Sequence, residues 1–268
     1  MSAADLPSEK TGAVAQIRDG LAAYEFEPFF QPIVDLKDST LVGFEALARW
    51  RHAERGLVEP VEFIQLAETN GLIRAIDSVI LDRAWCAFDD ALAACARLHA
   101  PMLLSVNLSA THLFDGAIVD RIRGLVAGGR GQRTRLQFEI TETMLIEDHA
   151  QAGQVMEQLK TLGVSFALDD FGTGYSSLVY LHRLPIDCIK IDRSFSEAIL
   201  TSPRSRAIVR AIIELASAMD LRAVAEGVEE KDVADALLGL GCRHGQGLYF
   251  GPPIPAGELA AWLERGGV

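Results

Sequence analysis

The sequence lacks any apolar run long enough to cross a lipid bilayer, and its first 20 residues lack the apolar core of a secretory signal peptide. It contains only four cysteines, with no C-x-x-C pair, and its six histidines form no H-x-x-x-H pair. These absences argue against a zinc site. They predict a cytoplasmic chain, not bound to a membrane, whose free thiols are Cys86, Cys95, Cys188 and Cys242.

Positive charge is also scarce. The chain carries 25 Lys and Arg residues against 37 Asp and Glu residues, a formal charge of −12. Such a balance disfavours nonspecific binding to nucleic acid, which a diffuse positive potential drives. An anionic ligand would therefore need a local source of positive charge, and a metal ion is the obvious one.

What the sequence does have is enough apolar residues, 49% of 268, to form either one barrel-sized domain or two smaller ones. Runs of β-branched and aromatic residues bounded by turn signals predict eight strands. Those strands are expected at 26–35, 41–48, 102–108, 135–140, 164–169, 187–191, 222–226 and 243–249. Apolar residues at helical spacing predict helices at 60–69, 74–98, 147–161, 204–219, 229–240 and 256–265. Strands that alternate with helices favour a single closed β/α barrel.

The connection between the first two strands is exceptional because it comprises only residues 36–40. A parallel crossover needs about a dozen residues, so these two strands must form a hairpin. The prediction is an α/β fold, a modified TIM (β/α)8 barrel with one antiparallel strand. Residues 1–24 are expected to form a helical lead-in, and residues 25–268 the single barrel domain.

Polar side chains recur where the predicted strands end. These are Glu45 and Arg49, Asn107, Glu139, Asp169 and Asp170, Lys190 and Asp192, Glu226, and Gln246. The carboxyl ends of barrel strands meet at one rim, which is where active sites of this fold lie. Any one of these residues alone is more easily explained as a solvent-facing or ion-paired side chain. Together they would repel one another without cations, and hard oxygen ligands of this kind favour Mg²⁺ or Mn²⁺.

Eight ordered segments give the chain a family resemblance. They are FFQPIVD, GFEALARW, SVNLS, FEITE, ALDDFGTGYSSL, IKIDRSF, AEGVE and HGQGLYFG, and they extend from about residue 29 to residue 255. In this order the segments resemble the EAL family of cyclic di-GMP phosphodiesterases. Three letters such as E-A-L would mean nothing alone, whereas the ordered set is highly specific.

The resemblance implies roles for individual residues. It implies that Glu45, Asn107, Glu139 and Asp169 bind one metal ion, and that Asp169, Asp170 and Glu226 bind a second. Lys190 would orient the attacking water, with Glu45 and Glu226 as the other catalytic residues. Gln31, Leu47, Arg49, Asp170, Glu229 and Gln246 would contact the substrate. A regulatory loop would include Phe171, Gly172, Thr173 and Gly174, steadied by Glu142.

The activity that the resemblance implies is hydrolysis of cyclic di-GMP to linear pGpG, by in-line attack of a water that two Mg²⁺ or Mn²⁺ ions activate. Ca²⁺ is expected to bind without supporting turnover. The resemblance also implies a homodimer. Two alternatives stay open: a catalytically inactive cyclic di-GMP receptor, and a barrel phosphodiesterase for another substrate.

Overall fold

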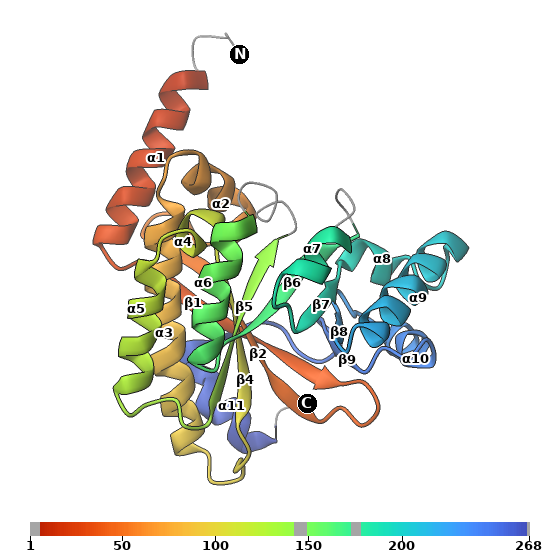
Figure 1. Cartoon of the computed structure of the whole chain (residues 1–268). Helices are drawn as coiled ribbons and strands as arrows, with labels where there is room; N and C mark the ends of the chain where they lie inside the picture. Colours follow the sequence, from red (N-terminus) through yellow and green to blue (C-terminus); the bar gives the residue numbers. More distant parts are fainter. Residues whose placement is uncertain (1–5, 142–148, 173–177, 267–268) are drawn as a thin grey trace.

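Eight strands form a closed barrel in the computed structural model, which describes residues 6–141, 149–172 and 178–266. The strands are β1 (Phe26–Asp35), β2 (Leu41–His52), β4 (Met102–Asn107), β5 (Thr134–Thr141), β6 (Ser165–Phe171), β7 (Cys188–Ile191), β8 (Arg222–Ala225) and β9 (His244–Gln246). Each strand pairs with the next, and β9 returns to pair with β1 (Figure 1).

Strand β1 runs against the rest of the barrel. It pairs antiparallel with both β2 and β9, whereas every other neighbouring pair among these eight strands is parallel. The hairpin turn is closed by backbone bonds from Ser39 N to Asp35 O at 2.8 Å and from Asp35 N to Thr40 O at 2.9 Å. The predicted barrel with one antiparallel strand is therefore confirmed.

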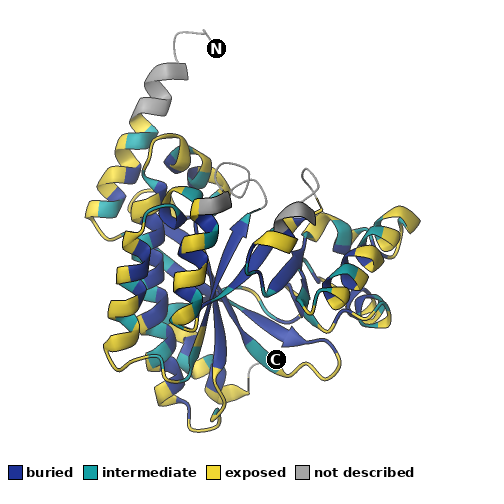
Figure 2. Cartoon of the chain, in the orientation of Figure 1, coloured by how far each residue is buried: buried dark blue, intermediate teal, exposed yellow. Residues whose placement is uncertain are grey.

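Helices cover the outside of the strands (Figures 1 and 2). Figure 1 shows α3, α5 and α6 on one side of the strands, with α9 and α10 on the other, while α1 leads away from the barrel. The helices are α1 (Leu6–Ala22), α2 (Pro60–Thr69), α3 (Ile73–Ala94), α4 (Ala110–Leu113), α5 (Ala117–Ala127), α6 (His149–Thr161), α7 (Leu178–Arg183), α8 (Arg193–Glu197), α9 (Pro203–Ala218), α10 (Lys231–Gly239) and α11 (Leu259–Arg265). No helix in the described part of the chain is long and apolar enough to span a membrane.

Some elements were not predicted. Short strands β3 (Gly56–Val58) and β10 (Ile254–Pro255) extend the sheet beside β2 and β1. Helix α5, which buries Ile118, Val119 and Ile122, was also missed. The predicted last strand, 243–249, is too long: β9 ends at Gln246.

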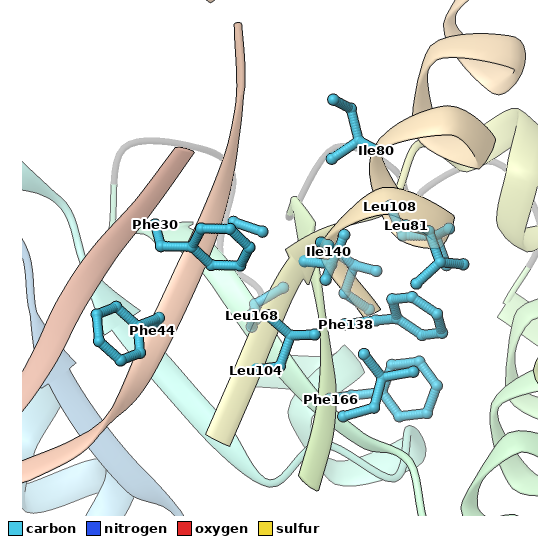
Figure 3. Close-up of a cluster of buried hydrophobic side chains, with 14 of the residues drawn as sticks. Phe30, Phe44, Ile80, Leu81, Leu104, Leu108, Phe138, Ile140, Phe166 and Leu168 are labelled. Atoms are coloured by element: carbon cyan, nitrogen blue, oxygen red, sulfur yellow. The ribbon is translucent and has the colours of Figure 1, made fainter. Parts of the chain in front are cut away.

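The apolar core lies mainly between the strands and the helices. Alternate residues of each strand point outward, and in Figure 3 Phe138 and Ile140 of β5 lie near Ile80 and Leu81 of α3. Burying a large apolar side chain fully contributes about 1.5–3 kcal/mol. This shell therefore stabilises the barrel from outside.

The inside of the barrel is different. A small apolar group fills part of it, namely Ile33, Leu103, Ala167, Cys188 and Val224. Its other buried side chains include polar ones from the inward-facing positions of β2, β4, β5, β7 and β9: Glu45, Ser105, Gln137, Glu139, Lys190 and Gln246. All four cysteines are free, as predicted, and three of them are buried.

Candidate active site

Lys190 lies at the centre of the polar group inside the barrel. Its ammonium Nζ is 2.5 Å from Glu139 Oε2 and 2.5 Å from Glu226 Oε1. The same atom is 3.2 Å from Asp169 Oδ1 and 3.3 Å from Glu45 Oε2. The Lys190 side chain is only 2% exposed. One buried cation thus contacts four carboxylates that come from β2, β5, β6 and the end of β8.

Glu45 is fixed by two side-chain amides. Asn107 Nδ2 donates to Glu45 Oε1 at 2.9 Å, and Gln246 Nε2 donates to Glu45 Oε2 at 2.5 Å. Burial alone raises the pKa of Glu45, but the Lys190 charge and these hydrogen bonds outweigh it and lower the pKa below its ordinary value. Glu45 is therefore held as a carboxylate in a fixed orientation.

Glu139 and Glu226 respond in the opposite direction. Burial, together with the Glu45 charge, raises the pKa of Glu139 well above its ordinary value although Lys190 opposes the shift. Burial raises the pKa of Glu226 to about 8, again against the effect of Lys190. For Lys190 itself, burial lowers the pKa, but the surrounding carboxylates, with Asp169 the largest influence, raise it well above the usual range. One ammonium is thus too little positive charge for the four carboxylates around it, of which Glu45 and Glu139 are buried.

Asp169 and Asp170 both reach the site although they are consecutive. Neighbouring residues of a regular strand point to opposite faces. Here the pairing of β6 with β7 shifts between Leu168 and Phe171, and Asp170 has a left-handed backbone with φ of 54°. As a result, Asp169, Asp170 and Glu226 each offer a carboxylate oxygen, and these oxygens lie within 4.8 Å of one another. Burial and the Asp169 charge raise the pKa of Asp170.

The residues present fit a divalent metal. Every charged ligand here is a carboxylate, the type that Mg²⁺ and Mn²⁺ prefer. Asp169 Oδ1 is buried and, within the described part of the chain, makes no hydrogen bond beyond its ion-pair distance to Lys190. A cation that took up this oxygen would also offset the excess negative charge around Lys190.

Four further residues were expected to contact substrate, and the structure shows the neighbours of each. Gln31 faces Glu45 across the β1–β2 hairpin, and Leu47 faces Phe29. Arg49 pairs with Glu59 at 3.1 Å, with its guanidinium 5.8 Å from the centre of the Phe29 ring. Glu229 is turned to Arg193, with Arg193 Nη2 at 3.2 Å from Glu229 Oε1. Gln31 thus lies beside one of the carboxylates, and both charged residues have protein partners.

The predicted regulatory loop is described only in part. Phe171 is buried, and Gly172 has a φ of 98°. A Cβ on Gly172 would lie 3.1 Å from the Phe195 ring, so both its backbone and its surroundings favour glycine. Glu142, Thr173 and Gly174 lie outside the described residues.

Three polar residues beside the carboxylates were not identified from the sequence. Ser105 Oγ donates to Glu139 Oε1 at 2.6 Å, and Gln137 and Arg222 continue the hydrogen bonding away from the site. Ser105 and Gln137 lie two residues before Asn107 and Glu139 on the same strands. The alternation of side chains along a strand could have indicated them, because a residue two positions before a proposed ligand faces the same side of the strand.

Comparison with known proteins identifies the family. A family model described as the EAL domain matches residues 14–253, a range that begins within α1. The chain belongs to the EAL-domain family, which confirms the predicted resemblance.

Named relatives are similar over most of this chain. Cyclic di-GMP phosphodiesterase NbdA of Pseudomonas aeruginosa is 39% identical over 249 residues, 93% of this chain and 31% of that protein. The structure of the PaMucR phosphodiesterase in complex with c-di-GMP has a TM-score of 0.84 and 35% identity, covering 92% of this chain and 99% of that one. EAL enzyme Bd1971, with cAMP and cyclic di-GMP bound, has a TM-score of 0.90 and 34% identity over 96% of this chain and 69% of that one. The chain spans only about a third to two fifths of the length of the curated relatives it matches.

Proposed function

We propose that this chain hydrolyses cyclic di-GMP to linear pGpG with the help of Mg²⁺ or Mn²⁺. The observation that carries the proposal is the group of four carboxylates around Lys190, with Asp170 beside them. Family membership supports the substrate, since similar proteins are named as cyclic di-GMP phosphodiesterases and a related domain is known in complex with this nucleotide.

The ligands divide into two sets that share one residue. Glu45, Asn107, Glu139 and Asp169 would hold one ion, and Asp169, Asp170 and Glu226 would hold a second. When bound, such ions lower the pKa of water and offset the charge of a phosphodiester. The amide contacts of Glu45 support this division because they orient its carboxylate before any ion arrives.

Lys190 brings positive charge from the chain itself to the place proposed for the attacking water. Its ammonium can donate a proton in a hydrogen bond to the attacking water, and so orient it toward phosphorus. The water oxygen forms a new bond to phosphorus, the P–O3′ bond breaks, and the released 3′ oxygen takes up a proton. Glu226 is the candidate base for the proton that water loses, because its Oε1 lies 2.5 Å from Lys190 Nζ, beside the position proposed for the attacking water.

Arg49 would bind a phosphate of the substrate through its planar guanidinium. In this structure it is paired with Glu59, whose side chain is 56% exposed. An exposed partner gives up an ion pair at little cost, since such pairs contribute about 0–1 kcal/mol. Gln31, Leu47, Glu229 and Gln246 complete the proposed substrate contacts. We also propose that the active protein is a cytoplasmic homodimer and that residues 25–268 form its barrel domain.

Incubation of the purified protein with cyclic di-GMP and Mg²⁺, Mn²⁺ or Ca²⁺ tests this function. We expect pGpG with Mg²⁺ or Mn²⁺, and bound but uncleaved nucleotide with Ca²⁺. Tight binding of cyclic di-GMP with no pGpG formed, whichever of the three ions is present, would instead indicate a receptor. Hydrolysis of another phosphodiester in preference to cyclic di-GMP, in a competition between the two, would indicate a different substrate class.

A further inference from the structure

A chain of hydrogen bonds crosses the inside of the barrel and ends on Glu139. Arg222 Nη2 donates to Gln137 Oε1 at 2.6 Å. Gln137 Nε2 then donates to Ser105 Oγ at 3.0 Å, and Ser105 Oγ donates to Glu139 Oε1 at 2.6 Å. We propose that Ser105, Gln137 and Arg222 are positioning residues that orient Glu139 as a metal ligand, an inference that rests on the proposed function.

The direction of every hydrogen bond in this chain follows from its first member. A guanidinium has donors and no acceptor, so the atom of Gln137 that faces Arg222 must be its carbonyl oxygen. The amide nitrogen of Gln137 is then left to donate to Ser105. Because a hydroxyl has a single proton, Ser105 must direct that proton to Glu139. The Arg222 guanidinium, at one end of this series of hydrogen bonds, thus fixes Glu139 Oε1 as an acceptor at the other end.

This arrangement leaves the other oxygen of Glu139 for the metal site. Glu139 Oε2 is the atom that lies 2.5 Å from Lys190 Nζ, among the other carboxylates. A carboxylate held at one oxygen cannot rotate freely about its terminal bond. A ligand fixed in this way loses less rotational freedom when an ion binds, which favours binding.

The strand register explains how Arg222 reaches across the barrel. Residues Glu139, Ala167, Cys188 and Arg222 lie opposite one another in successive strand pairs from β5 to β8. The two residues between Glu139 and Arg222 have small, fully buried side chains. Their size leaves room for the long Arg222 side chain to pass over β7 and β6 and meet Gln137.

Three residues of this hydrogen-bond series are buried, so each depends on its neighbours for hydrogen bonds. Ser105, Gln137 and Glu139 are each no more than 1% exposed. Bulk solvent does not reach these groups, and a buried polar group without a partner costs about 1–3 kcal/mol. Loss of one hydrogen bond should therefore change the orientation of the next member.

A purely structural network would affect only stability, whereas a positioning network also affects metal binding. Mn²⁺ binding, followed by electron paramagnetic resonance on nucleotide-free protein, separates the two roles. We expect Ser105→Ala to weaken Mn²⁺ binding by about tenfold or more, the usual effect of removing a partner of a metal ligand. The matched control is Ser165→Ala, which removes a half-buried hydroxyl on β6 that bonds Leu136 O at 3.3 Å, and it should bind Mn²⁺ as the wild type does.

Gln137→Glu provides a second test that nearly preserves shape. The new carboxylate can pair with Arg222 but cannot donate to Ser105, so two carboxylates compete for the single hydroxyl proton. We expect weaker Mn²⁺ binding. Added negative charge by itself would strengthen Mn²⁺ binding. A charge effect and a loss of positioning therefore predict opposite changes in Mn²⁺ affinity. This variant decides the matter if Ser105→Ala does not fold.

The outcomes distinguish this inference from the proposed function. If the wild type binds Mn²⁺ and cleaves cyclic di-GMP while folded Ser105→Ala and Gln137→Glu bind Mn²⁺ equally well, the positioning role alone is overturned. If the wild type neither binds Mn²⁺ nor cleaves cyclic di-GMP with Mg²⁺ or Mn²⁺, the proposed function fails as well. Weaker binding in both variants, with normal binding in Ser165→Ala, supports the inference.

Discussion

In the proposed mechanism, Lys190 has two roles that depend on the same four contacts. Its ammonium holds together carboxylates that would otherwise repel one another, and it lies where an attacking water would need a hydrogen-bond donor. The opposite pKa shifts of Glu45 and Glu139 show that burial and charge act differently on groups only a few ångströms from the same cation. The proposed chemistry would therefore depend on the position of a single side chain.

We expect Lys190→Ala to lower kcat by about 100-fold or more, the effect typical of a positioned proton donor or acceptor. Binding of cyclic di-GMP should change far less, because Arg49 and the other proposed contacts are retained. Single-turnover cleavage and equilibrium binding measure the two effects separately. Lys231→Ala is the control, since Lys231 is exposed and pairs only with Asp235 at 2.5 Å among its described ion pairs. Unchanged cleavage in Lys190→Ala would exclude the proposed role.

At the scale of the secondary-structure elements, two features of strand packing position the proposed metal ligands. The shifted pairing after Leu168 lets Asp169 and Asp170 face the same site. Gly43, two residues before Glu45, permits β2 and β4 to approach closely: a Cβ at this position would lie 2.2 Å from Leu103 O. The site thus depends on how neighbouring strands pack as well as on which side chains they carry.

Gly43→Ala should destabilise the protein by about 1–3 kcal/mol, as overpacking of a close contact does. Displacement of β2 from β4 should also weaken metal binding through Glu45. Denaturant unfolding and Mn²⁺ titration measure the two effects. Gly12→Ala, on α1 with no heavy atom within 4 Å of the added Cβ, should be neutral or stabilising because alanine favours helix. Equal stability of the two variants would contradict the packing argument.

The closure of the barrel at β1 and β9 should depend on pH through Asp35. Burial raises the pKa of Asp35, but hydrogen bonds from Arg243 at 2.6 Å and from the Lys37 amide at 2.9 Å lower it below its ordinary value of 3.8. A group with a lowered folded-state pKa contributes stability above its unfolded pKa, and this contribution is lost as the pH falls through the folded-state value.

We therefore expect Asp35→Asn to be less stable than the wild type at pH 7. The difference in the free energy of unfolding should shrink as the pH falls below 3.8, the ordinary aspartate value. Urea unfolding of both proteins across this range tests the sign. A difference that is constant with pH would show that the charge of Asp35 contributes nothing.

The sequence predicted the elements that the site needs, for identifiable reasons. The strand ends could be found because each has an apolar run followed by a polar residue, as at Asn107 and Glu226. The short connection at residues 36–40 was enough to predict the antiparallel β1. The connection from Arg222 to Glu139 could not be predicted, because it joins β8 to β5 across the interior and depends on the small size of Ala167 and Cys188. The bulge at Asp170 likewise has no signal in the residue types alone.

At the scale of the whole molecule, bound ions should act as part of the folded structure. A ligand that binds only the folded state stabilises it by about 2.7 kcal/mol at 100 times its Kd. Mn²⁺ should therefore raise the Tm of the wild type, and Glu45→Gln, which keeps the shape but removes one charge, should show a smaller increase. Glu62→Gln is the control, because Glu62 forms a surface pair with Arg55. Equal increases in Tm for all three proteins would place the ion elsewhere.

A crystal structure of the protein with cyclic di-GMP and Ca²⁺ tests the proposed metal centre most directly. We expect one ion shared by Glu45, Asn107, Glu139 and Asp169, a second shared by Asp169, Asp170 and Glu226, and uncleaved nucleotide above them. The proposed metal centre would be contradicted if nucleotide bound at the barrel rim while no ion lay among these carboxylates and Lys190 remained their only cation.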